Sequence, residues 1–92
     1  MSNDFRYQRS PHVLWRRTLE TVAVLAVDGD DPIVLAGTGA DVWMLIVEPR
    51  TLDDLVTILS ERYAGDPTVI ASDVAQLLDT LTDAGLLISS AA

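Results

Sequence analysis

The apolar stretch Pro32–Ala36 ends at Gly37-Thr38-Gly39, and this point divides the sequence into two kinds of pattern. Before it, branched and apolar residues occur in short runs that favour β-strands. After it, apolar residues recur at the spacing of amphipathic helices. A chain with its strands first and its helices afterwards is expected to form an α+β domain, with the helices packed on one face of the sheet.

Three strands are expected in the first part: Val13–Arg17, Thr21–Val27 and Pro32–Ala36. The second is apolar on both faces, which is typical of a central strand. Asp28-Gly29-Asp30-Asp31 predicts the tight turn that follows it. The three strands therefore form an antiparallel meander, and Pro32–Ala36 is one of its two edges.

Three helices are expected in the second part. The first spans about Gly39–Glu48, with Thr38 as its N-cap, Asp41 completing a near capping box, and Pro49 as its stop. The second begins after the cap residue Thr51 and ends at Ala64-Gly65.

The third helix begins with the cap Asp66 followed by Pro67, and Gly85 is its expected stop. Its apolar stripe consists of Ile70, Val74, Leu77, Leu78 and Leu81. With three strands and three helices in this order, a winged-helix-like arrangement is predicted.

The domain is expected to span residues 13–88, in line with one domain for a chain of 92 residues. Residues 1–12 are predicted to be a flexible N-terminal arm, and residues 89–92 a frayed C-terminus. Leu86–Ile88 is expected to tuck back against the core. With neither a signal-peptide pattern nor a membrane-length apolar run, a soluble cytoplasmic protein is expected.

The charge balance argues against nucleic acid and anionic membranes as partners. The formal net charge is −8, all six basic residues are arginine, and four of them precede Thr18. A protein that binds nucleic acid needs a basic face to neutralise phosphates. A basic or mostly apolar partner is more compatible with this chain.

Motifs for catalysis, metals or cofactors are weak, and we predict no enzyme and no cofactor. His12 is the only histidine and the chain has no cysteine. Asp28-Gly29-Asp30-Asp31 lacks the later glutamate of a calcium loop. Gly37-Thr38-Gly39 lacks the lysine of a phosphate-binding loop and the third glycine of a dinucleotide fingerprint. A surface histidine, a hairpin turn and a strand-to-helix turn are therefore the favoured interpretations.

The sequence leads to different predictions for the two tryptophans. Trp43 is expected to anchor the core, because the helix around it is apolar on nearly all sides. Trp15 is compatible equally with the core and with an exposed contact.

The predicted edge strand Pro32–Ala36 carries no charge, although proteins normally charge, shorten or cover an apolar edge. Either another part of the protein covers this strand, or a partner strand binds there. The stripe of the third helix is compatible with a core face or with one wall of a groove. In the second case, an extended peptide could add a fourth strand beside the edge.

Four segments resemble the PqqD-like proteins, the peptide-recognition elements of ribosomal natural-product pathways. They are residues 35–43, 51–55, 72–81 and 85–87, within a similarity that covers about residues 13–88. The resemblance is to the stand-alone recognition proteins, including those of lasso-peptide pathways. Where many members have an asparagine after the third strand, this chain has Gly37-Thr38-Gly39.

The resemblance implies a non-catalytic chaperone that binds the leader segment of a precursor peptide and presents it to a modifying enzyme, such as a leader peptidase, a cyclase or a radical enzyme. It implies that the leader lies as an added strand between the third strand and the third helix. The residues that this places at the site are Pro32, Ile33, Val34, Leu35, Asp73, Val74, Leu77, Leu78 and Leu81.

Two alternative functions follow from the same element order. One is a winged-helix DNA-binding module, which the acidic balance disfavours. The other is a structural dimerisation module, in which the edge strand pairs across a two-fold axis. The oligomeric state is accordingly open between monomer and homodimer.

Overall fold

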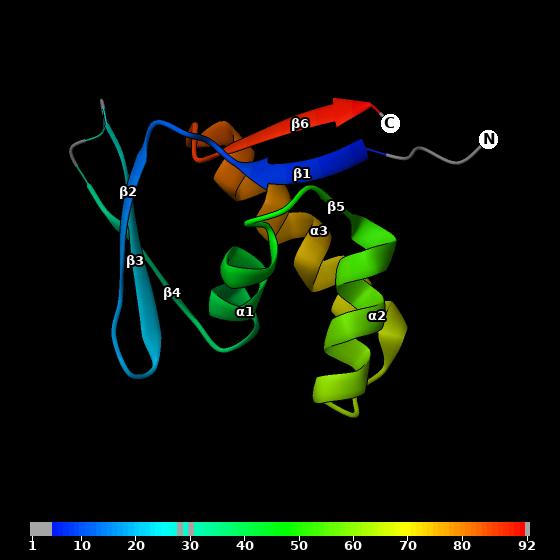
Figure 1. Ribbon diagram of the computed structural model, residues 1–92. Coiled ribbons are helices and arrows are strands. Elements are labelled where there is room, and N and C mark those ends of the chain that lie inside the picture. Colours follow the sequence, from blue (N-terminus) through cyan, green and yellow to red (C-terminus); the bar gives the residue numbers. More distant parts are fainter. Residues whose placement is uncertain (1–4, 28, 30, 92) are drawn as a thin grey trace.

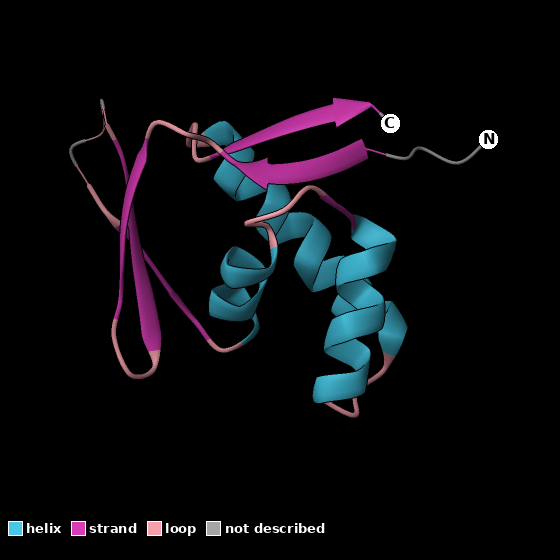
Figure 2. Ribbon diagram, viewed as in Figure 1, coloured by secondary structure: helices cyan, strands magenta, loops and turns pink. Residues whose placement is uncertain are grey.

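The computed structural model describes residues 5–27, 29 and 31–91, which form two small sheets and three helices (Figure 1). The strands are β1 (Phe5–Arg9), β2 (Val13–Arg17), β3 (Thr21–Ala26), β4 (Ile33–Ala36), β5 (Arg50–Thr51) and β6 (Leu87–Ala91). The helices are α1 (Thr38–Leu45), α2 (Leu52–Arg62) and α3 (Pro67–Asp83). Figure 2 shows the β2–β3–β4 sheet at one side of the helices and the β1–β6 pair across one end of them.

The predicted meander is confirmed as an antiparallel sheet of order β2-β3-β4. β3 is central, and β4 is an edge strand in which Leu35 lies opposite Val22. The α+β class is confirmed with it. Asp28 and Asp30 of the predicted turn lie outside the described residues.

A second sheet, of order β5-β1-β6, corrects two expectations about the ends of the chain. Residues 5–9 are not a flexible arm, and residues 89–91 are not frayed, because these segments pair antiparallel from Phe5 opposite Ala91 to Arg9 opposite Leu87. The aromatic residues Phe5 and Tyr7 alternate with polar residues, a strand signal that the sequence prediction did not use, but nothing local identifies the partner strand. Each strand satisfies the backbone groups of the other only after the intervening domain has brought them together.

Arg9 links this second sheet to the first. Its Nε donates a hydrogen bond of 2.8 Å to the Trp43 carbonyl oxygen, and its guanidinium carbon lies 4.6 Å from the Trp15 ring centroid and 5.1 Å from that of Trp43. The two rings meet edge to face at 6.5 Å. Burial lowers the pKa of Arg9, which nevertheless remains charged at neutral pH. Trp15 is thus a half-exposed contact.

One hydrophobic core joins the helices to the inner face of the β2–β3–β4 sheet. Trp43 is fully buried, which confirms it as a core anchor, and among the described residues no polar or charged residue is buried. The buried residues are Val22, Val24, Leu35, Val42, Trp43, Ile46, Leu55, Leu59, Val74, Leu78, Leu81, Leu86 and Leu87. Leu86 and Leu87 therefore turn back against the core as predicted, whereas Ile88, which was expected to do the same, is exposed.

The ends of α2 and α3 follow the predicted signals. Thr51 and Asp54 form a capping box at the start of α2. The Thr51 N–H donates to the Asp54 carboxylate, and this hydrogen bond holds the pKa of Asp54 below its usual value. Asp66 caps α3 by accepting from the Thr68 N–H. Gly85 follows α3 with a φ of 76°, as a helix stop does.

The predicted capping box at the start of α1 is wrong. Its N-cap is Gly37, which has φ 57° and no side-chain cap bond. The Asp41 carboxylate accepts instead from the Tyr63 hydroxyl and lies 3.7 Å from Arg62. α1 also ends at Leu45, before the predicted Glu48. Arg50 Nε donates to the Leu45 carbonyl oxygen and the Arg9 N–H donates to the Ile46 carbonyl oxygen, so groups outside the helix bond the carbonyls at its end.

No helix in the described part of the chain combines the length and the apolar character needed to cross a membrane.

Gly37→Ala is expected to destabilise the protein by about 1–2 kcal/mol, because a side chain strains the positive φ at this position. A Cβ atom there would meet nothing within 4 Å, so the cost is conformational and not a clash. Urea unfolding followed by circular dichroism measures it.

Gly39→Ala is the matched control, two residues further on in α1. Its Cβ would make ordinary contacts, the closest at 3.7 Å, and alanine favours the helix. Equal destabilisation of the two variants would mean that the positive φ of Gly37 is not the cause of the loss.

Arg9→Met is expected to cost about 2 kcal/mol, since it removes a charge-assisted hydrogen bond and the contacts with two aromatic rings. Urea unfolding followed by tryptophan fluorescence measures the loss. Arg6→Met, on the same strand but exposed, should change stability by less than about 0.5 kcal/mol. Similar losses for both variants would mean that β1 does not depend on the Arg9 contacts.

Candidate functional site

The open side of β4 follows from the hydrogen bonds of β3, its neighbour. At the β2–β3 turn, the Thr18 N–H donates a 2.9 Å bond to the Thr21 carbonyl. Bonded and non-bonded residue pairs alternate along an antiparallel ladder. The backbone groups of Thr21 and of every second residue after it therefore point to β2. Those of Val22 and Val24, which lie between, point to β4.

The backbone N–H and C=O groups of β4 alternate in direction in the same way. Val22 lies opposite Leu35, so the backbone groups of Leu35, and those of Ile33 two residues before, point to β3. The N–H and C=O groups of Val34 and Ala36 point the other way. Because β4 is an edge strand, these groups face an open side of the sheet. An added strand would find its hydrogen-bonding partners there.

The side chains of the predicted strand residues alternate in the same manner. Leu35 is only 6% exposed and Ile33 is partly buried against the core, whereas Val34 is 63% exposed and Pro32 is exposed just before the strand. The inward side chains hold β4 in place. The outward ones are uncharged, so nothing on the strand itself repels an incoming chain.

Leu77 marks the flank of α3 that faces β4. A Cβ atom placed on Gly39 would lie 3.7 Å from Leu35 Cδ2 and 3.8 Å from Leu77 Cδ2, so both leucines approach one point beside the start of α1. Asp73 lies one helical turn before Leu77 and is exposed. The structure therefore brings Leu35, Leu77 and, one turn away, Asp73 to the same region.

Val74, Leu78 and Leu81 of the predicted site are part of the core. Their exposed fractions are 2%, 1% and 0%. Their side chains position α3 and do not form a surface. On the flank of Leu77, the sequence prediction missed the exposed residues Val69 and Thr80. Their spacing from Leu77 was a usable signal, because residues three or four apart, or eight apart, share a side of a helix.

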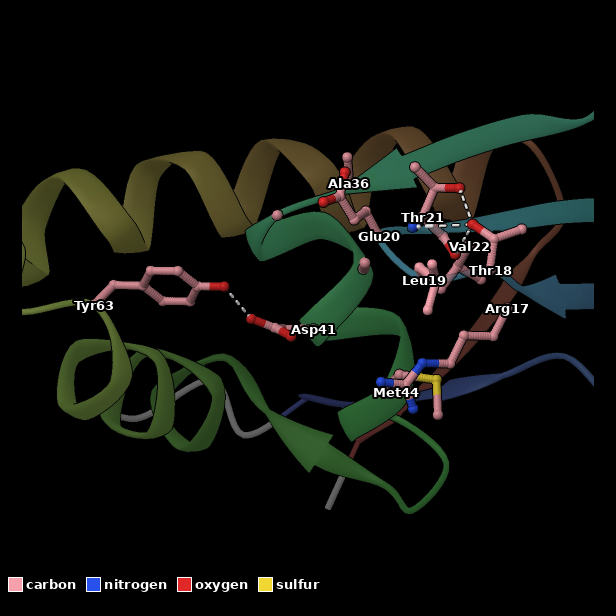
Figure 3. Close-up of a pocket in the computed structure, with 12 residues that line it drawn as sticks. Arg17, Thr18, Leu19, Glu20, Thr21, Val22, Ala36, Asp41, Met44 and Tyr63 are labelled. Carbon is pink, nitrogen blue, oxygen red and sulfur yellow. Dashed lines mark hydrogen bonds between the residues drawn. The ribbon is translucent and has the colours of Figure 1, made fainter.

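A cavity of about 450 Å³ lies elsewhere, between the β2–β3 turn, α1 and the end of α2 (Figure 3). Of β4 it borders only Ala36, the last residue of the strand, and it continues along Gly37, the N-cap of α1. In Figure 3, Tyr63 and Asp41 point toward each other across one side of it. Strand addition uses an open edge and needs no preformed cavity, so this pocket is not the site that the edge of β4 suggests.

Groups for metal chemistry are sparse. Within residues 5–27, 29 and 31–91, no cluster of three or more His, Cys, Asp or Glu side chains could hold a metal ion. His12 is exposed, as the sequence indicated.

Residues 21–87 match the family model of coenzyme PQQ synthesis protein D, PqqD. The chain belongs to the PqqD family. The match includes β3, β4 and all three helices, and it leaves β1 and β2 outside. No curated protein sequence matches this chain.

Two solved structures are similar in fold to this chain. TbiB1 in complex with the TbiA(beta) leader peptide is 21% identical, with a TM-score of 0.82 over 92% of this chain and 99% of that chain. The PqqD truncation of Methylobacterium extorquens PqqCD, a stand-alone recognition element for ribosomally synthesized and modified peptides, is 21% identical, with a TM-score of 0.75 over 90% and 88%. At this identity the likeness shows a shared fold.

In this PqqD-family chain, Asp41→Asn is expected to lower the pKa of Tyr63 toward the ordinary tyrosine value. The hydrogen bond to the Asp41 carboxylate raises the pKa of Tyr63, with a smaller contribution from burial. The stabilisation from this bond is present below the ordinary tyrosine pKa and is lost as the pH rises through the raised value.

Ultraviolet titration of the two tyrosines measures this effect. Tyr7, on β1 and remote from Asp41 in sequence, provides the internal reference. If Tyr63 titrates identically in the parent protein and in Asp41→Asn, the hydrogen bond does not persist in solution.

Proposed function

We propose that this protein binds the leader segment of a ribosomally made precursor peptide by strand addition at β4. The open row of backbone groups at Val34 and Ala36 carries this proposal. Membership of the PqqD family supports it, as do two proteins of the same fold, one bound to a leader peptide and one a recognition element. The role is recognition and not catalysis.

The leader would extend the β2–β3–β4 sheet by one strand. Main-chain hydrogen bonds to Val34 and Ala36 would supply affinity, and alternate leader side chains would point toward Leu35 and Leu77. Of the residues in the sequence prediction, Pro32, Ile33, Val34, Leu35, Asp73 and Leu77 remain assigned to the site. Val74, Leu78 and Leu81 support it from the core.

A modifying enzyme is the second partner that this function requires, because recognition without catalysis is useful only if the bound peptide reaches an enzyme. A leader peptidase, a cyclase or a radical enzyme would serve, in the cytoplasm where the precursor is made. Nucleic acid is disfavoured because the net charge is −8. Monomer and homodimer both leave the proposal intact, provided that a dimer does not pair through β4.

Val34→Pro is expected to weaken binding of the leader peptide about tenfold or more, equivalent to about 1.4 kcal/mol. Proline removes the outward N–H of Val34, and its ring obstructs an incoming strand. This N–H makes no bond to β3, so the fold should persist. Isothermal titration calorimetry measures the affinity, with a ten-residue peptide selected from a random library for binding to the parent protein as the probe.

Val34→Thr is the matched control, since it keeps both the N–H and the β-branched shape. It should bind within about twofold of the parent protein. Circular dichroism must show that both variants are folded. Unchanged affinity in a folded Val34→Pro variant would exclude strand addition at β4.

A further inference from the structure

The basic residues of this chain avoid every element around the open edge of β4. The six arginines occupy positions 6, 9, 16, 17, 50 and 62, and there is no lysine. The ranges 18–49 and 63–92 therefore contain no arginine or lysine, and they include β3, β4, α1, α3 and β6. Ten of the 14 acidic residues lie in these two ranges. β4 and α3, the two elements that would contact a peptide at this edge, therefore carry acidic side chains and no basic ones, and the Asp41 carboxylate of α1 is paired with Arg62 of α2.

Asp73 is the carboxylate of α3 that lies on the flank facing β4. It is four residues before Leu77, on the same side of the helix, and it is exposed. Asp79, two residues after Leu77, points to the opposite side, about 200° around the helix. The ion pairs between described residues engage Glu48 and Asp41, so Asp73 has no basic partner among them.

We propose that Asp73 selects peptides with a basic residue beside the apolar residue that meets Leu35 and Leu77. This inference rests on the proposed function and names the chemistry of the bound peptide. Inward side chains on an added strand are two residues apart, about 6.8 Å along the strand, and the side chain of lysine or arginine is long enough to bridge the remaining offset to a carboxylate one helical turn away. The recognised pattern is therefore an apolar residue with lysine or arginine two positions from it.

The size of the effect follows from the exposure of Asp73. A solvent-exposed ion pair changes affinity by about two- to fivefold, and added salt reduces it. Asp73 thus contributes preference among peptides. The backbone pairing at β4 contributes the larger part of the affinity.

A display library of random ten-residue peptides, selected on the intact protein, tests this inference. The same selection on Asp73→Asn removes the charge of interest, and selection on Asp79→Asn makes the same charge change on the far side of α3. The strongest binder and its analogue with glutamine in place of the basic residue are then compared by fluorescence anisotropy on each variant.

The expected result is enrichment of lysine or arginine two positions from an apolar residue, retained with Asp79→Asn and lost with Asp73→Asn. The basic peptide should lose about two- to fivefold in affinity on Asp73→Asn, and its glutamine analogue should lose nothing. Binders that depend on Val34 but show no basic preference would overturn the role of Asp73 and leave strand addition standing. If no binder is weakened by Val34→Pro, both proposals fail.

Discussion

The alternation of backbone groups along β4 is the constraint on which the proposed site depends. Ile33 and Leu35 direct their N–H and C=O groups to β3 and their side chains to the core, so half of the strand is committed to the fold. Val34 and Ala36 are left with unpaired groups on the other side. Because both sets belong to the same four residues, the core that holds the strand rigid also sets the register in which a guest chain must bind. A guest strand shifted by one residue would turn its own hydrogen-bonding groups away from those of Val34 and Ala36.

The helices complete this arrangement from behind the sheet. Trp43 and Val42 of α1 pack under β3 and β4, while Val74, Leu78 and Leu81 hold α3 against the same core. Leu77 stands at the margin, partly buried and close to the point that Leu35 also approaches. The position of α3 beside the open edge is thus set by buried residues that a peptide never touches. Specificity can vary at Asp73, Thr80 and Val69 without disturbing that core.

Local signals in the sequence were sufficient to predict the β2–β3–β4 meander, the position of β4 at its edge, and the N-caps of α2 and α3. A turn, a cap or a proline acts within a few residues, as at Thr51 and Asp66-Pro67. The second sheet was not predicted, because Phe5–Arg9 pairs with Leu87–Ala91 and with Arg50–Thr51, and these segments lie far apart in the sequence. For the same reason, periodicity identified the stripe on α3 but did not separate Leu77 at the surface from Val74, Leu78 and Leu81 beneath it. The predicted N-cap of α1 was wrong because the helix begins one residue earlier, with Gly37 as its N-cap, and the Asp41 carboxylate bonds to Tyr63, 22 residues away.

The pairing of β1 with β6 has a consequence for how such a domain can be combined with others. Phe5 and Ala91 are register partners, so the two ends of the described chain emerge side by side, and Figure 1 shows them at the far side of the helices from the β2–β3–β4 sheet. A module whose entry and exit points are adjacent can be spliced into a host polypeptide with little distortion of either. An enzyme could therefore carry this domain as an insertion or an appendage while the edge of β4 stays accessible.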